Sequence, residues 1–259
     1  VYDRTNYEPF LSMIDGLATS LNIYAYYCVK GFSYFWPKRH TPVAENILNN
    51  IISAEKVETY GVKLPKADIL SEPILHAVFD LEQDQRLLKL ARQVYLAHEA
   101  RYGATGNYTA FSEGNTDLEN PSYVYEWVVL SDGRTWVINV EITPIIYLKA
   151  AVGFLAIYNT EFARSMVEYV EARLPESTSG YMDGIDEDGR LVRTIIDKTN
   201  GLIISAARYA TRKLDLNLFP WPFIQGGVVN NTVVVIGESQ PHGPVGGAHT
   251  IDGLGGMLI

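Results

Sequence analysis

The sequence is poor in the residues that bind metals or form disulfides, with one cysteine (Cys28) and five histidines in 259 residues. A single cysteine cannot form an internal disulfide, and no C-x-x-C or H-E-x-x-H string occurs. Glycine-rich runs such as 243–247 lack the Lys-Ser/Thr of a phosphate-binding loop. We therefore expect no metal site and no cofactor. Cys28 lies in an apolar, aromatic stretch, where we expect a buried thiol.

Positive charge is also scarce, since 21 Lys and Arg stand against 30 Asp and Glu, a net charge of −9. A nucleic-acid surface needs clustered Lys and Arg to neutralise phosphates, so we expect no nucleic-acid partner. No run of about twenty apolar residues occurs, so we expect no membrane span. The chain begins at Val1 rather than Met, so it could be part of a longer protein. We favour an extracellular or cell-surface location, and the oligomeric state stays open.

Aromatic residues, in contrast, are plentiful: the sequence has 17 Tyr and 4 Trp, and 47% of its residues are hydrophobic. Aromatic side chains with a polar tip suit core packing and also stacking on sugar rings. The length allows one large domain. We expect a single domain over 1–259, with 219–259 as a Gly- and Pro-rich C-terminal extension.

Apolar residues recur at helical spacing along most of the chain. We predict helices over 7–29, 42–57, 74–81, 83–102, 141–158, 160–174 and 199–213, with Thr160 as an N-cap. Short aromatic and β-branched segments predict strands over 107–113, 122–130 and 135–139. The turn signature Ser131-Asp132-Gly133 predicts a hairpin over 123–138, and a second hairpin is expected over 180–195.

One tetrapeptide pattern occurs twice, as Asp3-Arg4-Thr5-Asn6 and as Asp197-Lys198-Thr199-Asn200. Each precedes a predicted helix, and Asp, Thr and Asn side chains accept hydrogen bonds from a first helical turn. Repetition in a helical chain indicates stacked helix pairs. The expected fold class is mainly α, an α/α toroid, complete or partial, with β-hairpin insertions on one rim.

The strings Ser179–Gly184, Asp197–Ile203 and Ala206–Tyr209 resemble a group of α/α-toroid domains of unknown function, similar to six-hairpin glycosidases. The resemblance covers 136–209. The same architecture serves many glycoside hydrolases and polysaccharide lyases. The resemblance therefore implies a toroid whose inner helices line a cleft and whose chemistry is on a carbohydrate.

Glycoside hydrolysis needs two carboxyl groups across a sugar. Glu113 precedes a glycine in Ser-Glu-Gly and is our candidate acid, with Asp183 or Glu126 as its partner. Each has a structural interpretation as well: Glu113 as a solvated residue before a turn, Glu126 as the polar side of an alternating strand, and Asp183 as part of an acidic hairpin. Asp186 and Asp188 are better explained as turn residues.

The predicted substrate-binding residues are Tyr123, Tyr125, Trp127, Trp136, Tyr181 and Asn200. Tyr123, Tyr125 and Trp127 should share one face of a strand. The function that we expect is a glycoside hydrolase acting on a polysaccharide or oligosaccharide, with a lyase less favoured. The alternative is a non-catalytic glycan-binding or cell-surface structural module. An enzyme should bring two carboxylates together beside aromatic side chains, whereas a module should show them scattered or held in structural hydrogen bonds.

Overall fold

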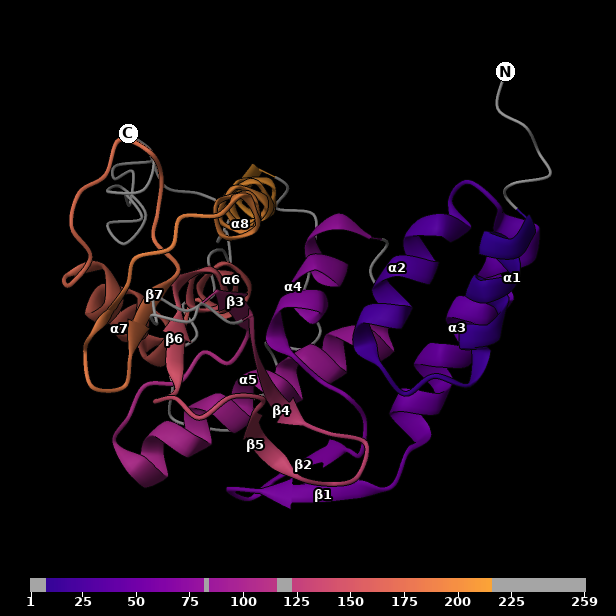
Figure 1. Ribbon diagram of the computed structural model, residues 1–259, viewed down its shortest axis with the longest axis horizontal. Helices are drawn as coiled ribbons and strands as arrows, with labels where there is room; N and C mark the ends of the chain where they lie inside the picture. Colours follow the sequence, from indigo (N-terminus) through magenta and orange to yellow (C-terminus); the bar gives the residue numbers. More distant parts are fainter. Residues whose placement is uncertain (1–7, 82–83, 116–122, 216–259) are drawn as a thin grey trace, which may run out of the picture.

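The computed structural model describes residues 8–81, 84–115 and 123–215 (Figure 1). Within these ranges, eight α-helices and one 3-10 helix combine with three small antiparallel sheets, ordered β1-β2, β3-β4-β5 and β6-β7-β8. The elements are α1 (Glu8–Asp15), η2 (Gly16–Thr19), α2 (Ile23–Ser33), α3 (Pro37–Ser53), β1 (Lys56–Thr59), β2 (Val62–Pro65), α4 (Ser71–Asp80), α5 (Gln85–Thr105), β3 (Glu113–Asn115), β4 (Tyr123–Val129), β5 (Thr135–Ile138), β6 (Ile145–Tyr147), α6 (Leu148–Tyr158), α7 (Glu161–Glu171), β7 (Gly184–Asp186), β8 (Leu191–Val192) and α8 (Asp197–Asp215).

The core is built around α6, whose residues are buried without interruption from Leu148 to Ile157. A helix that is apolar on every side must be surrounded by protein. Helices α4, α7 and α8 pack against α6. Gly153 allows the close approach of α4, because a Cβ there would lie 2.7 Å from Leu75 Cδ1. Helix α6 is therefore the centre of the packing.

The expected toroid is wrong: the chain has a mixed α/β fold. A toroid arranges pairs of helices in a ring around an open centre. Here α6 is buried among α4, α7 and α8, and the sheets β3-β4-β5 and β6-β7-β8 are part of the body rather than insertions on a rim (Figure 1). Helices α1 to α3 lie at one end of the molecule and α7 at the other.

Several local predictions are confirmed. The hairpin predicted over 123–138 is formed by β4 and β5, with Thr135 opposite Val129. Thr160 is the N-cap of α7, and its hydroxyl accepts a hydrogen bond from the amide of Ala163 at 3.2 Å. Asn159 takes a left-handed conformation with φ 47°, which closes the turn between α6 and α7. Strong local turn and cap chemistry accounts for these successes.

Other predictions about the elements are wrong. The helix predicted over 7–29 is divided, because the Asn22 side chain accepts hydrogen bonds from the first turn of α2. The helix predicted over 141–158 begins only at Leu148, because β6 pairs with β7 first. The strand predicted over 107–113 forms only from Glu113 onward. The hairpin β1–β2 was not predicted. Its turn is formed by Tyr60 and Gly61, which both have positive φ angles, 47° and 78°.

The repeated tetrapeptide does not act as a preceding cap. Helix α8 begins at Asp197, so the second copy forms the first turn of the helix itself. The first copy, Asp3–Asn6, lies outside the described residues, as does the predicted extension over 219–259. Cys28 is exposed rather than buried. None of the helices in the described ranges has the length and apolar character needed to cross a bilayer.

Gly184 gives a test of this fold. Its φ is +152°, and a Cβ there would lie only 2.1 Å from the backbone oxygen of Ile146 in β6. Gly184→Ala should therefore lower the free energy of unfolding by about 3 kcal/mol or more, measured by urea denaturation. Gly201→Ala on α8, where a Cβ would meet no atom within 4 Å, is the control and should leave stability unchanged or slightly higher. Equal effects of the two changes would contradict this packing.

Candidate functional site

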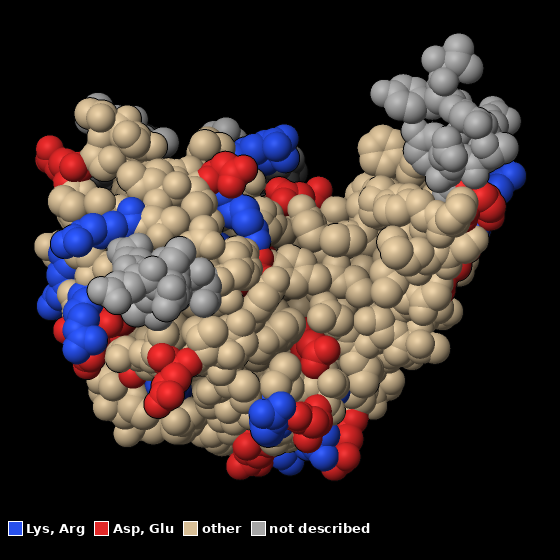
Figure 2. Space-filling view, in the orientation of Figure 1, with Lys and Arg blue, Asp and Glu red and all other residues tan. Residues whose placement is uncertain are grey.

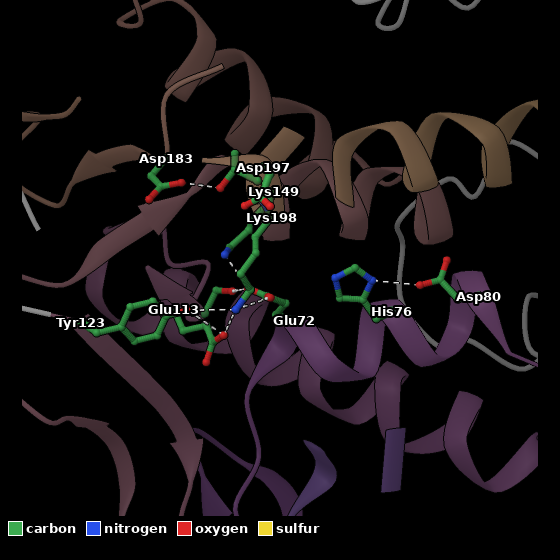
Figure 3. A network of polar contacts seen from close by, with 11 residues as sticks. Glu72, His76, Asp80, Glu113, Tyr123, Lys149, Asp183, Asp197 and Lys198 are labelled. Carbon is green, nitrogen blue, oxygen red and sulfur yellow. Dashed lines mark hydrogen bonds and ion pairs between the residues drawn. The ribbon is translucent and has the colours of Figure 1, made fainter. Parts of the chain in front are cut away.

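Two glutamates and two lysines form a charge cluster next to the core: Glu72, Glu113, Lys149 and Lys198 (Figure 3). The ammonium of Lys149 lies 2.5 Å from Glu72 Oε2, and both side chains are buried. The ammonium of Lys198 lies 3.0 Å from Glu72 Oε1 and also contacts Glu113 Oε1. One lysine thus connects the two carboxylates.

The cluster forms where three helices begin. Glu72 lies in the first turn of α4, Lys149 in the first turn of α6, and Lys198 in the first turn of α8, while Glu113 is the first residue of β3. A helix N-terminus attracts negative charge, which suits Glu72 but not the lysines. The lysines are stable in these positions because each has a carboxylate partner. Segments distant in sequence meet at this point.

A buried histidine fixes the backbone just before Glu113. His98 Nδ1 donates to the backbone oxygen of Val94 at 2.8 Å, and its Nε2 accepts from the amide of Phe111 at 3.2 Å. Burial lowers the pKa of His98 to about 4, so the ring is neutral at physiological pH. This neutral ring ties α5 to the segment that leads into β3, and so it positions Glu113.

The charges in the cluster balance, and opposite charges offset the effect of burial on Glu72 and Lys198. Burial alone would raise the pKa of Glu72, but Lys149 and Lys198 outweigh it, so that this pKa lies below its ordinary value of 4.5. Burial would lower the pKa of Lys198, yet its contacts with Glu113, Tyr123 and Glu72 raise it above the ordinary value. Glu72 and Lys198 therefore remain charged at neutral pH.

Two tyrosines enclose the ammonium of Lys198. It donates a hydrogen bond to the Tyr123 hydroxyl at 2.8 Å, and that hydroxyl donates to Glu113 Oε1 at 2.8 Å. The ammonium is 5.5 Å from the centre of the Tyr123 ring and 6.0 Å from that of Tyr24, distances at which a cation is attracted to an aromatic face. The side chain of Lys198 is still 38% exposed, so this part of the cluster is accessible from solvent.

Asp183 adjoins the cluster and is buried. Its Oδ1 accepts a hydrogen bond from the Thr199 hydroxyl, and the backbone of Asn115 also contributes to stabilising the carboxylate. Burial raises the pKa of Asp183, and the Thr199 hydroxyl opposes this effect. Its backbone is fixed by hydrogen bonds to Leu148 and Thr194.

Gly114 separates Asp183 from Glu113. A Cβ at Gly114 would lie 2.9 Å from Asp183 Oδ2 and 2.7 Å from the ring of Tyr147, so that a larger residue would collide with both. The Tyr147 hydroxyl is buried and has no hydrogen-bond partner within the described part of the chain. The Asp183 carboxyl group and the Tyr147 hydroxyl thus converge on a position that only glycine fits, and the hydroxyl lacks a partner within the described residues. Buried polar groups without a partner are rare in folded proteins.

Glu126, the third candidate carboxylate, lies near Tyr147 but is held in a structural hydrogen bond. Its Oε1 accepts a hydrogen bond from the amide of Ile145 at 2.7 Å, which connects β4 to β6. Burial raises the pKa of Glu126 well above its ordinary value, with a further contribution from Glu187 and an opposing one from Arg101. Glu126 is fully buried on the inner face of β4 and supports the fold.

The outer face of β4 carries three aromatic rings, as the alternation predicted: Tyr123, Tyr125 and Trp127. Ring centres are 5.0 Å apart between Tyr123 and Tyr125, and 5.9 Å apart between Tyr125 and Trp127. Glu113 stands opposite Tyr125 in the register of β3 and β4, and partners in an antiparallel pair share a face. We call this surface the aromatic face; it includes one member of the charge cluster.

The remaining predicted binding residues have structural contacts. The Trp136 indole donates to Thr59 Oγ1 at 2.7 Å and packs edge-on against His98 and Phe111. Asn200 accepts from the amide of Tyr181 at 2.9 Å and donates to its carbonyl at 3.1 Å. The two hydrogen bonds between Asn200 and Tyr181 fix a loop beside α8, and neither of these two residues lies on the aromatic face.

The surface is hollowed between the side of the molecule that carries α8 and the side that carries α1 to α3 (Figure 2). Acidic and basic side chains gather on the wall of this hollow nearest α8. Helices α2, α4 and α8 meet here, since α4 contacts both of the others. No group of three or more His, Cys, Asp or Glu side chains in the described ranges is arranged to hold a metal ion.

Sequence reasoning missed Glu72, Lys149 and Lys198. A signal for Lys149 exists, because it is the only charged residue in the apolar run Leu148–Ile157. A lone charge on a helix buried on every side requires a partner. No pattern in the sequence identifies Glu72 as that partner.

The described chain is thus a mixed α/β domain with a charge cluster at the meeting point of three helix starts. The model of DUF3131, a family described as a protein of unknown function, matches residues 22–213. This match covers most of the chain, which therefore belongs to that family. No curated protein and no solved structure matches the chain.

Replacing Lys149 with methionine tests the buried ion pair. Lys149→Met leaves the Glu72 carboxylate buried with one cation instead of two, which should cost about 3–5 kcal/mol of unfolding free energy. The double variant Glu72→Met/Lys149→Met should lose less than the sum of the two single changes. Lys66→Met removes a surface pair with Glu55 and should change stability by about 1 kcal/mol or less. Additive single effects in urea denaturation would contradict the coupling.

The raised pKa of Glu126 predicts a pH dependence of stability. In the folded state Glu126 keeps its proton at a pH where the unfolded chain has lost it, so the folded state binds more protons and stability falls as pH rises above about 4.5. Glu126→Gln should remove this loss and keep the hydrogen bond to Ile145. Its gain in unfolding free energy over wild type should therefore increase from about pH 5 to about pH 8. A constant difference would argue against a buried neutral carboxyl.

Proposed function

We propose that this domain binds a neutral glycan across the aromatic face and cleaves it by hydrolysis with Glu113 and Asp183. The observation that carries the proposal is the presence of the Glu113 carboxylate on the same sheet face as Tyr123, Tyr125 and Trp127. Aromatic rings offer flat apolar faces to sugars, and a carboxylate beside them is in place for chemistry at a glycosidic bond.

The two carboxyl groups have different surroundings, as acid and base roles require. Glu113 contacts the Lys198 ammonium and the Tyr123 hydroxyl. Burial raises the pKa of Asp183, which favours its protonated form. We therefore assign the proton donor to Asp183 and the role of base or nucleophile to Glu113, the reverse of the roles expected from sequence. Asp183 would protonate the leaving oxygen, while Glu113 would activate water or attack the sugar.

The charge balance supports a neutral substrate. The two lysines of the cluster already have carboxylate partners, and the chain as a whole carries a net charge of −9. An anionic sugar would find no cation in the cluster without such a partner. Lyase chemistry on a uronate would require a cation that is free to neutralise the uronate carboxylate.

One observation favours a second candidate, a glycan-binding module without catalysis. Lys198 connects Glu72 and Glu113, and Thr199 holds Asp183, so that each of these carboxylates has a structural contact. In such a module the aromatic face would bind the glycan and the charge cluster would only support the sheet.

Release of reducing ends from a panel of neutral polysaccharides tests the proposal. Wild type should release them, and Glu113→Gln and Asp183→Asn should each reduce the rate by about a hundredfold or more. Asp188→Asn changes a turn residue whose side chain is 54% exposed and should retain activity. Circular dichroism melts establish that the variants are folded.

Unchanged rates in both variants would contradict the assigned roles. If wild type bound a polymer in affinity electrophoresis but released nothing, and Tyr125→Ala weakened that binding, the non-catalytic module would be the better description. Neither release nor binding with any polymer in the panel would contradict a carbohydrate function.

A further inference from the structure

Large apolar side chains are concentrated at one end of the molecule. Eight large hydrophobic residues are exposed within the described ranges, and five of them lie on α1 and on the turn between α2 and α3. We call these five the aromatic tip: Phe10, Met13, Tyr34, Phe35 and Trp36. Phe35 is 77% exposed and Met13 is 61% exposed. The other three exposed residues, Tyr60, Tyr125 and Ile204, are on separate elements. Clustered exposure of this kind indicates an interaction surface.

The side chains of the aromatic tip pack against one another and lie on helices that are joined by ion pairs. Ring contacts connect Phe10 to Phe32 at 5.5 Å, Phe32 to Trp36 at 6.3 Å, and Trp36 to Phe35 at 6.0 Å. Beneath it, Arg39 of α3 binds Glu8 at 2.9 Å and Asp15 at 2.8 Å, which fastens α3 to α1. The rings are therefore presented by helices that are fixed to one another.

The segments that carry the tip hold slightly more basic than acidic residues, whereas the whole chain carries −9. Residues 8–15 and 30–39 contain Lys30, Lys38 and Arg39 against Glu8 and Asp15, and both acidic side chains pair with Arg39. Lys38 is exposed next to the rings. Tyr and Trp are enriched at the boundary between lipid and water, and lysines near such rings are attracted to anionic headgroups.

We propose that the aromatic tip inserts into the headgroup region of a lipid bilayer that carries anionic lipids. Phe35 and Met13 would enter the acyl boundary, Tyr34 and Trp36 would lie at headgroup level, and Lys38 would contact lipid phosphates. A second copy of the chain is a poorer occupant, because pairing two tips would bring like-charged lysines together. The tip lies at the end of the molecule away from α7 and α8, so docking leaves the aromatic face of β4 accessible (Figure 1).

Co-sedimentation with vesicles tests this proposal independently of any carbohydrate function. Wild type should bind vesicles of phosphatidylcholine mixed with phosphatidylglycerol, and bind less to phosphatidylcholine alone or at high salt. Phe35→Ala should weaken binding by about tenfold, from the loss of a buried ring. Lys38→Ala should weaken it by about fivefold on anionic vesicles only. Ile204→Ala is the matched control, since Ile204 is 68% exposed on α8, and should bind as wild type does.

Wild type that remained in the supernatant with both vesicle types would overturn the proposal. So would equal binding by wild type, Phe35→Ala and Lys38→Ala. Sedimentation velocity distinguishes the other occupant: a concentration-dependent dimer that Phe35→Ala dissociates, with no vesicle binding, would assign the tip to contact between copies and would also overturn the lipid proposal.

Discussion

The ion pair between Glu72 and Lys149 is the contact on which the arrangement depends. Both side chains are buried, and removing either would leave a charge in the core with too few partners. The pair joins α4 to the central helix α6, and Lys198 extends it to α8 and, through Glu113, to β3. Four elements that are distant in sequence are therefore positioned by one set of charges. Apolar packing around α6 supplies the bulk of the burial, while these charges fix which elements meet.

Glycine determines how closely the sheets approach this centre. At Gly114 the lack of a side chain lets Asp183 and Tyr147 reach the edge of β3, and at Gly184 it lets β7 pass the backbone of β6. At both positions the neighbouring chain segment lies so close that only glycine can be accommodated. The Asp183 carboxyl group and the Tyr147 hydroxyl beside Gly114 have few hydrogen-bond partners within the described residues. For this reason the region is our candidate for binding a ligand.

Local chemistry allowed part of the fold to be predicted from the sequence. The β4–β5 hairpin, the Thr160 cap and the shared face of Tyr123, Tyr125 and Trp127 each depend on residues close together in the chain. The toroid prediction failed because it required knowledge of how helices pack, and the apolar periodicity of 141–158 does not reveal that β6 pairs with β7 before α6 begins. Glu113 and Asp183 were chosen as candidates because each lies beside a glycine or a turn in the sequence, and their roles stay predictions. The charges around them, Glu72 above all, were missed because their pairing is entirely non-local.

The burial of Lys149 also bears on how the chain folds. Helix α6 can enter the core only together with the carboxylate that compensates its lysine, and that carboxylate arrives on α4. Docking of α4 on α6 and desolvation of α6 are therefore coupled steps. A collapsed state in which α4 and α6 were not paired in this way would contain a buried Lys149 ammonium without its carboxylate partner. The buried charge of Lys149 thus selects the native pairing of helices from the apolar alternatives during folding.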